Sequence, residues 1–213
     1  MPIRGKVISE ISPEDILDLI LQGTPEDAFL EFKAELMDPR KPREQLQANR
    51  ADWVADVVAF ANAEGGHIIV GMEADDQERA SQLKPMTGDW AKGLADSLRD
   101  HAIQYIKPRI ERLEVRGFEI PVAGWIVIAG IPYSEAKPYM SSFGNATKFT
   151  IRDGNRKREM AYEEIRALFL KGPEQQIRAQ FLDEVLSINS RIGSIEKEIE
   201  RLGSSWNTIS QRF

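Results

Sequence analysis

The first residues of the chain show a helical pattern followed by an extended one. Ser12, Pro13 and two acidic residues precede an apolar stretch that ends at Gly23, which is the sequence of a capped helix. After the Thr24-Pro25 break, residues Phe29 to Lys33 alternate apolar and charged side chains beyond Leu30, as a half-buried strand does. The pattern therefore predicts a short helix and then a strand.

A long helix and a buried strand follow. From Gln45 to Ala63 apolar residues recur at helical spacing, and we expect Arg50, Asp52 and Asp56 to face away from that apolar stripe. Gly65-Gly66 ends the helix. The next segment, His67 to Met72, is a nearly continuous apolar run bounded by glycines, which is typical of a central strand buried on both faces.

The second half of the chain predicts five further elements: a helix at Trp90–Ala102, strands at Ile110–Arg116, Glu119–Ile131 and Lys148–Arg152, and a helix at Glu163–Lys171. We expect the first two strands to form a hairpin around Gly117, and the third to enter a turn at residues 153–155. Helices and strands interleave without a regular βαβ repeat. This order predicts an α+β fold, a mixed sheet with flanking helices.

A change of periodicity marks the C-terminal part of the chain. Gly172-Pro173 interrupts the preceding helix, so we expect one domain at residues 1–172 and a helical segment at 173–213. In that segment apolar residues alternate steps of three and four, at Val185, Ile188, Ile192, Ile195, Ile199 and Leu202. This heptad seam predicts a coiled coil joining copies of the chain, preferably a dimer, although isoleucine at both core positions leaves trimers open. The alternative is a helix that folds back on its own domain.

Composition limits the chemistry and the location of the protein. The chain has 213 residues, a formal net charge of −6 and no cysteine, which excludes disulfides, thiol catalysis and cysteine zinc sites. Without a run of about 18 apolar residues or a signal-peptide pattern, we expect a cytoplasmic protein with no membrane partner. We expect structural roles for His67 and His101, since neither has a partner at catalytic spacing.

Basic residues gather in one stretch despite the acidic total. Residues 147–171 contain the candidate nucleic-acid contacts Lys148, Arg152, Arg156, Lys157 and Arg158. Alternation along the strand places Lys148, Thr150 and Arg152 on one face. These cations could contact phosphates without specifying bases. The alternative is a solvated hairpin whose basic residues pair with Glu159, Glu163 and Glu164.

Several short motifs, taken in order, resemble a known family. They are Leu30-Glu31-Phe32-Lys33, the segment Ala59-Phe60-Ala61-Asn62-Ala63-Glu64-Gly65-Gly66 leading into Ile69-Val70-Gly71, Ile131-Pro132-Tyr133-Ser134 before Lys137-Pro138, and Arg152-Asp153-Gly154 before Glu164-Ile165. In this order they resemble the Schlafen AlbA-type domain of bacterial proteins. The resemblance covers roughly Leu17 to Lys171, and the block around Phe60 to Gly71 is its most specific part.

The resemblance implies nucleic-acid binding, DNA or RNA, in regulators or defence components, and RNA cleavage by three carboxylates in some animal Schlafens. Glu26 and Glu31 match the first two of those acids, while the third position falls on Ala74, between Glu73 and Asp75. We predict a binding protein without a cofactor. The alternative is a ribonuclease that holds Mg²⁺ or Mn²⁺ on these carboxylates, because both ions prefer oxygen ligands. A third hypothesis is a ligand-sensing oligomerisation module.

Overall fold

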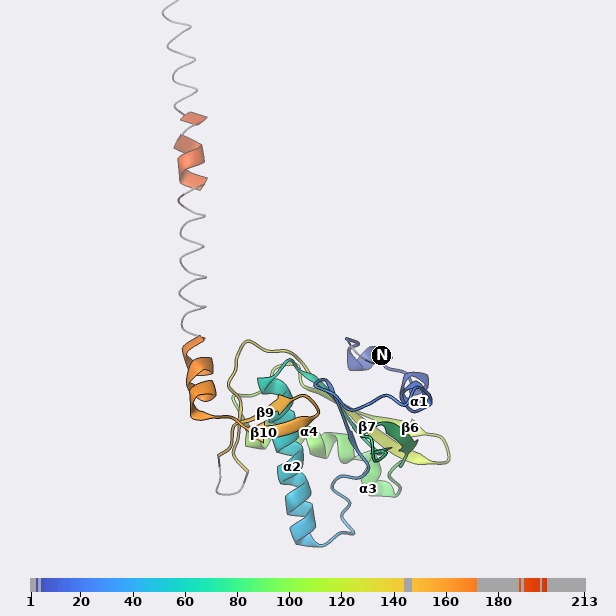
Figure 1. The fold of residues 1–213 in the computed structure, drawn as a ribbon. Helices are drawn as coiled ribbons and strands as arrows, with labels where there is room; N and C mark the ends of the chain where they lie inside the picture. The colour runs from blue at the N-terminus through green and yellow to red at the C-terminus, as the bar shows by residue number, and fades with distance from the viewer. Residues whose placement is uncertain are drawn as a thin grey trace, which may run out of the picture. The chain divides into compact units, whose positions relative to one another are not determined.

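A four-stranded mixed sheet lies at the centre of the domain (Figure 1). Its order is β1 (Leu30–Lys33), β2 (Gly66–Val70), β7 (Gly124–Ile131) and β6 (Glu114–Ile120). Strands β1 and β2 are parallel, whereas β2 pairs with β7, and β7 with β6, in antiparallel register. The computed structural model describes residues 3, 5–143, 147–171, 188, 190–195 and 197–198.

Helices and small strand pairs surround this sheet. The helices are η1 (Ile8–Glu10), α1 (Pro13–Leu21), α2 (Arg43–Asn62), α3 (Asp89–Lys92) and α4 (Leu94–Tyr105), and residues 162–171 are also helical. The antiparallel pairs are β3 (Met72–Ala74) with β4 (Ala80–Leu83), β5 (Ile106–Lys107) with β8 (Met140–Ser141), and β9 (Thr150–Asp153) with β10 (Arg156–Glu159). The predicted α+β class, a mixed sheet with flanking helices, is confirmed.

Apolar clusters cover both faces of the sheet. Ile68 of β2 belongs to the cluster formed with α2 and α4, and the neighbouring Ile69 belongs to the cluster formed with η1 and α1. Successive strand residues point to opposite faces, so a strand covered on both sides becomes a continuous apolar run. On the α2 side, the indole of Trp53 donates to the carbonyl oxygen of Leu98 at 2.9 Å. The predicted central strand is therefore confirmed.

Two local predictions are wrong, and both concern glycines. Residues 121–123 form the turn between β6 and β7, whereas Gly117 lies within β6. A Cβ atom at Gly117 would lie 3.3 Å from the ring of Trp125, so packing in the sheet explains this glycine. The predicted helix at Trp90–Ala102 is divided at Gly93 into α3 and α4.

The chain divides into two compact units, Met1–Leu168 and Phe169–Phe213. In the second unit, residues 188, 190–195 and 197–198 are helical. The predicted boundary Gly172-Pro173 and the seam residues Val185, Ile199 and Leu202 lie outside the described residues. Within the described part of the chain, no helix is both long enough and apolar enough for a membrane crossing.

Candidate nucleic-acid interface and its buried ion pairs

The β9–β10 hairpin, which carries the predicted basic residues, lies against helix α2 (Figure 1). Gly154 supplies the turn with a φ of 62°, a conformation that suits glycine. On β9 the side chain of Thr150 is buried and its hydroxyl donates to the carbonyl oxygen of Ala55 in α2 at 2.9 Å. The predicted strand and turn are confirmed, and one face of β9 points into the domain.

Arg152 follows Thr150 on this inward face and pairs with Glu31 of β1. Its Nη1 lies 2.5 Å from Glu31 Oε2, and the two side chains are only 2% and 11% exposed. The remaining guanidinium nitrogens donate to the carbonyl oxygens of Asp27, at 3.0 and 3.2 Å, and Leu30, at 3.2 Å. The guanidinium also lies 4.7 Å from the centre of the Phe60 ring. Arg152 therefore fastens the hairpin to β1 and presents almost no surface to solvent.

A second group of charges joins the hairpin to α2. Lys33 Nζ lies 2.9 Å from Glu31 Oε1, 3.1 Å from Asp52 Oδ2 and 3.0 Å from Asp56 Oδ2. Lys157 of β10 contacts the other carboxylate oxygens of both aspartates, at 2.6 Å for Asp56. Asp56 is only 1% exposed. The expectation that these aspartates face away is therefore wrong for Asp56, whereas the side chain of Asp52 is 43% exposed. Both contact two lysines, one on β1 and one on β10.

Burial and charge oppose each other in this group. Burial by itself would lower the pKa of Lys33, but the carboxylates of Asp56, Glu31 and Asp52 outweigh it and raise the pKa. Burial raises the pKa of Asp56 even though two lysines act against it, whereas at Asp52 the lysines outweigh burial and lower the pKa. Because removing one partner would leave a buried charge without compensation, this network should be sensitive to single substitutions.

Glu26 lies beside the network and carries a different kind of perturbation. Its carboxylate accepts a hydrogen bond from the backbone N–H of Phe32 at 2.7 Å. Burial raises the pKa of Glu26 to about 7, and the charge of Glu31 adds to this effect, while the Phe32 hydrogen bond, Arg152 and Lys33 oppose it. Glu26 and Glu31, the first two acids of the ribonuclease hypothesis, are therefore electrostatically coupled.

The other two predicted acids lie in the β3–β4 hairpin with partners of their own. Glu73 pairs with Lys84 at 2.6 Å, and Asp75 accepts backbone hydrogen bonds within its turn and pairs with Arg79 at 3.1 Å. In the part of the chain that the structure describes, no group of three or more histidine, aspartate or glutamate residues is arranged to hold a metal ion. Both oxygens of Glu31 are engaged by Arg152 and Lys33, so the residues present do not fit Mg²⁺ or Mn²⁺.

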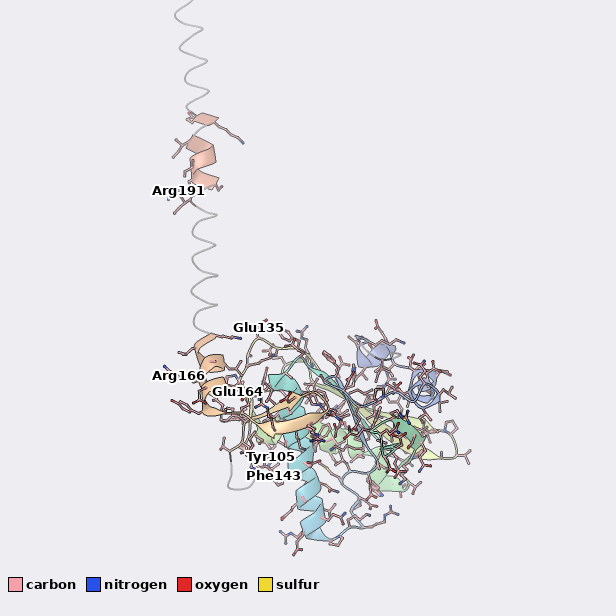
Figure 2. The ribbon with its side chains drawn as sticks, in the orientation of Figure 1. Tyr105, Glu135, Phe143, Glu164, Arg166 and Arg191 are labelled. Atoms are coloured by element: carbon pink, nitrogen blue, oxygen red, sulfur yellow. The ribbon has the colours of Figure 1, made fainter. Side chains whose placement is uncertain are left out.

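Three of the predicted contacts are exposed: Arg156 and Arg158 on β10, and Lys148, which precedes β9. Lys148 pairs with Glu159 at 2.6 Å, and Arg158 pairs with Glu164 at 2.8 Å (Figure 2 labels Glu164). The Arg158 guanidinium lowers the pKa of Glu164 to about 2. Arg156 is exposed, and among the described residues it has no ion-pair partner. This surface thus combines one unpaired cation, Arg156, with two cations whose exposed carboxylate partners could be replaced by another anion.

Asn62 connects the motifs that lie far apart in the sequence. Its amide donates to the carbonyl oxygens of Tyr139 and Thr150, each at 2.8 Å, and its carbonyl oxygen accepts from the Tyr139 N–H at 2.7 Å. Lys137 donates to the carbonyl oxygen of Ala63 at the end of α2. The roles of Asn62, Asp52 and Asp56 were missed from sequence; the four-residue spacing of the aspartates on one helix face was the available signal.

The two histidines contact the backbone. His67 Nε2 lies 3.2 Å from the carbonyl oxygen of Lys6, and His101 Nδ1 lies 2.7 Å from that of Ser97. Burial lowers the pKa of His67, which favours the neutral ring. In each histidine, one ring nitrogen therefore has a backbone carbonyl oxygen as its partner.

Fold and site together define an α+β domain whose basic hairpin is fastened to the sheet and to α2 by buried ion pairs. The family model described as Schlafen, AlbA_2 matches residues 26–161, more than half of the chain. The chain therefore belongs to this family. No curated protein sequence matches it.

Two solved structures are similar to the chain. The DIP2311 protein from Corynebacterium diphtheriae has 15% sequence identity and a TM-score of 0.44, and the match covers 68% of this chain and 29% of that one. The N-terminal domain of a putative ATP-dependent DNA helicase RecG-related protein from Nitrosomonas europaea has 15% sequence identity and a TM-score of 0.40. That match covers 64% of this chain and 86% of the other. The match thus spans less than a third of the Corynebacterium protein.

Proposed function

We propose that the chain binds nucleic acid through the outer surface of the β9–β10 hairpin, with Lys148, Arg156 and Arg158 as the phosphate contacts. The observation that carries this proposal is the exposed Arg156 beside the hairpin turn, which has no ion pair among the residues that the structure describes. Arg158 follows it on β10 and Lys148 precedes β9, and both have exposed partners. Membership of the Schlafen, AlbA_2 family supports nucleic-acid binding by this domain but does not indicate which residues make the contacts.

The inward cations have a supporting role in this proposal. Arg152 and Lys157 hold the hairpin on β1 and α2, so the outer cations are mounted on a rigid element and little ordering is required on binding. A phosphate can replace the carboxylate partner of a solvated arginine or lysine, since such surface pairs are weak. Phosphate contacts alone carry no base information, so the proposal covers both DNA and RNA.

The net charge of −6 restricts the proposed binding to this surface. A uniformly basic protein releases many counterions along a polyanion, whereas a patch of a few cations releases few. We therefore expect modest affinity with a shallow salt dependence. Bringing several hairpins together on one polyanion would raise the affinity through effective concentration.

Fluorescence anisotropy with labelled single-stranded RNA, tRNA and duplex DNA at two salt concentrations tests this function. Arg156→Glu should weaken binding and reduce the salt slope by about one. Lys92→Glu is the matched control, because Lys92 is an exposed cation on α3 with the same change in charge. Equal effects of the two variants would contradict the proposal, and salt-insensitive or absent binding would favour the ligand-sensing hypothesis instead.

The ribonuclease alternative is tested in the same samples. Adding Mn²⁺ or a chelator distinguishes binding from cleavage, because a metal-dependent nuclease requires the ion. Cleavage that depends on Mn²⁺ and is lost in Glu31→Gln would favour the enzyme. A Glu31→Gln protein that still cleaves at the wild-type rate would eliminate it.

We also propose that copies of the chain associate through the C-terminal helical segment. Ile188, Ile192 and Ile195 follow the heptad spacing and are 48%, 48% and 58% exposed in the single chain. Exposed isoleucines in such a row are stabilised when a second copy covers them, and an isolated helix is marginal in water. The self-complementary spacing supports a dimer as the preferred form.

Light scattering tests the association. The full chain should have a mass that is a multiple of 24.1 kDa, and Ile192→Asp should reduce it to a single chain. Ser194→Asp is the control, because Ser194 is exposed on the same helical segment but lies outside the seam. A wild-type mass of one chain would refute the association and favour a helix that folds back.

A further inference from the structure

Strand β6 is an open edge of the central sheet. It pairs with β7 on one side only and forms the end of the strand order. Over the described residues, the one backbone hydrogen bond that β6 makes outside its ladder with β7 is from Ala123 N to the oxygen of Ile120, at the turn. An unpaired strand edge presents a row of N–H and C=O groups that can pair with another chain.

A groove lined by arginines follows the beginning of this edge. Two hollows of about 380 and 310 Å³ share Arg99 and Leu113 as lining residues. The first is also lined by Arg109 and Arg112, and the second by Arg116. Their floors are aliphatic, and no aromatic side chain lines either hollow.

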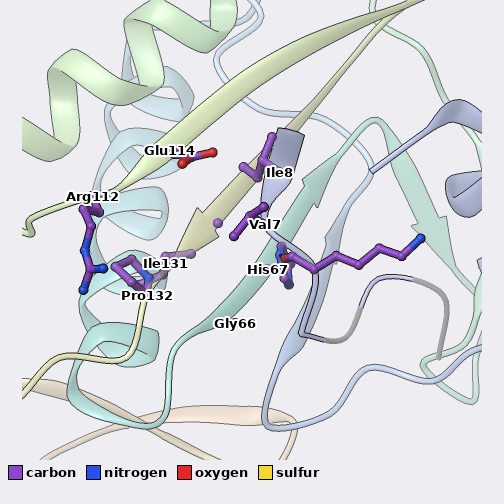
Figure 3. A pocket seen from close by; sticks show the side chains of 10 residues that line it. Val7, Ile8, Gly66, His67, Arg112, Glu114, Ile131 and Pro132 are labelled. Atoms are coloured by element: carbon purple, nitrogen blue, oxygen red, sulfur yellow. The ribbon is translucent and has the colours of Figure 1, made fainter. Parts of the chain in front are cut away.

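A smaller, mainly apolar pocket lies beside the groove and is lined in part by residues of β2 and β7 (Figure 3). Its volume is about 130 Å³, and Val7, Ile8, Ile131 and Pro132 provide apolar walls. Arg112 lines this pocket as well as the first hollow, so the two cavities are neighbours. The pocket can hold an aliphatic side chain, while the neighbouring arginines can hold carboxylates.

The arginines of this groove are less neutralised than those of the hairpin. Arg99 pairs with Asp96 at 2.5 Å. Arg109, Arg112 and Arg116 are exposed, and none of them forms an ion pair with any residue of the described ranges. Such a cluster of cations next to an apolar floor is electrostatically complementary to an acidic ligand that also carries apolar groups.

We propose that the β6 edge docks an extended peptide segment of a partner protein in which acidic and aliphatic side chains alternate. Main-chain hydrogen bonds to β6 would extend the sheet by one strand, and alternate side chains would enter the apolar pocket and meet the arginines. In an extended segment, residues two apart share a face. The acidic side chains of the alternating segment would therefore lie on one face, toward the arginines, and the aliphatic ones on the other, toward the apolar pocket.

The same features disfavour nucleic acid at this edge. Sites for single strands combine cations with aromatic platforms for the bases, and the two arginine-lined hollows contain none. Glu111 and Glu114 also line the groove and would repel phosphates and peptide carboxylates alike, so the missing aromatic platforms are what distinguish the two ligands. Strand β6 lies at the opposite edge of the sheet from β1, to which Arg152 fastens the hairpin, so this surface is separate from the proposed nucleic-acid surface.

Fluorescence anisotropy and amide hydrogen exchange on the full chain test this docking. The probe is a labelled eight-residue peptide that alternates glutamate and valine, and a lysine–valine peptide is its control. The acidic probe should bind the wild type and slow amide exchange in residues 114–119. Combining Arg112→Glu with Arg116→Glu should weaken binding of the acidic probe by about tenfold or more, because its carboxylates would then face carboxylates of the protein. The control Arg156→Glu should leave probe binding unchanged.

Three outcomes would overturn the proposal: no binding of the acidic probe, equal binding to wild type and to the double variant, or binding without protection of residues 114–119. An oligonucleotide that binds wild type and is lost only in the Arg112 and Arg116 variant would assign the groove to nucleic acid instead. Both arginines are exposed, so the variant should fold, and an unchanged circular dichroism spectrum checks this.

Discussion

Replacing Arg152 by leucine should destabilise the domain more than any change on the hairpin surface. The substitution removes the positive charge that lies 2.5 Å from Glu31 in a position where the arginine side chain is 2% exposed. It also removes the donors to the carbonyl oxygens of Asp27 and Leu30. Glu31 would keep Lys33 as its only cation among the described residues, at 2.9 Å.

The magnitude follows from the cost of a broken buried pair. Removing one partner of such a pair costs about 3–5 kcal/mol, because the other charge stays buried. The orphaned carbonyls of Asp27 and Leu30 act in the same direction, and Lys33 compensates in part, so about 4 kcal/mol is expected for Arg152→Leu. A domain of this size is stable by about 5–15 kcal/mol, so the loss is a large fraction of the total.

Urea unfolding followed by tryptophan fluorescence measures the effect, since Trp53 is fully buried. The midpoint should fall with an unchanged slope if only stability has changed. Arg156→Ala is the surface control and should stay within about 0.5 kcal/mol of wild type. Replacing both Glu31 and Arg152 by leucine should cost less than Arg152→Leu alone, because no unpaired charge remains.

The outcome that refutes this reasoning is an Arg152→Leu protein within about 1 kcal/mol of wild type. A double variant that is as unstable as the single one would also contradict it, because the destabilisation would then come from packing rather than charge. The proposed nucleic-acid binding should fall in Arg152→Leu as well, since the hairpin loses its attachment to β1.

Three further predictions concern the surroundings of the hairpin. The folded-state pKa of Glu26 is raised from 4.5 to about 7, so the folded protein binds the proton more tightly. Between these pH values wild-type stability should fall as pH rises, relative to Glu26→Gln, by about 1–2 kcal/mol once screening of this partly exposed group is allowed for. Urea midpoints of both proteins at pH 5 and 7.5 measure the difference. Asn62→Ala should lower the free energy of unfolding by about 3–5 kcal/mol in the same assay. The substitution leaves buried backbone groups without a hydrogen-bond partner, among them the N–H and the carbonyl oxygen of Tyr139. Gly65→Ala should lower the thermal midpoint, since the new Cβ would lie 2.5 Å from the oxygen of Ile131 at a φ of +76°.

Local physics explains which elements were predicted correctly. The helix Pro13–Leu21 begins at a capping box in which Ser12 and Asp15 exchange hydrogen bonds, and both residues are adjacent in sequence to what they cap. The β9–β10 turn depends on Gly154, whose permissive backbone is a property of the residue itself. The turn placed at Gly117 failed because that glycine accommodates Trp125 across the sheet, and nothing next to it in sequence indicates this.

For the candidate site, the sequence predicted which residues share a face of the strand, but not which face points to solvent and which into the domain. Alternation placed Thr150 and Arg152 together, and they do share a face, but that face meets α2 and β1 rather than solvent. Arg156 has the same chemistry as Arg152 and lies outside. Only the pairing of distant segments separates them: Arg152 and Glu31 are 121 residues apart, so the contact that buries one arginine arises only when the hairpin packs against the sheet.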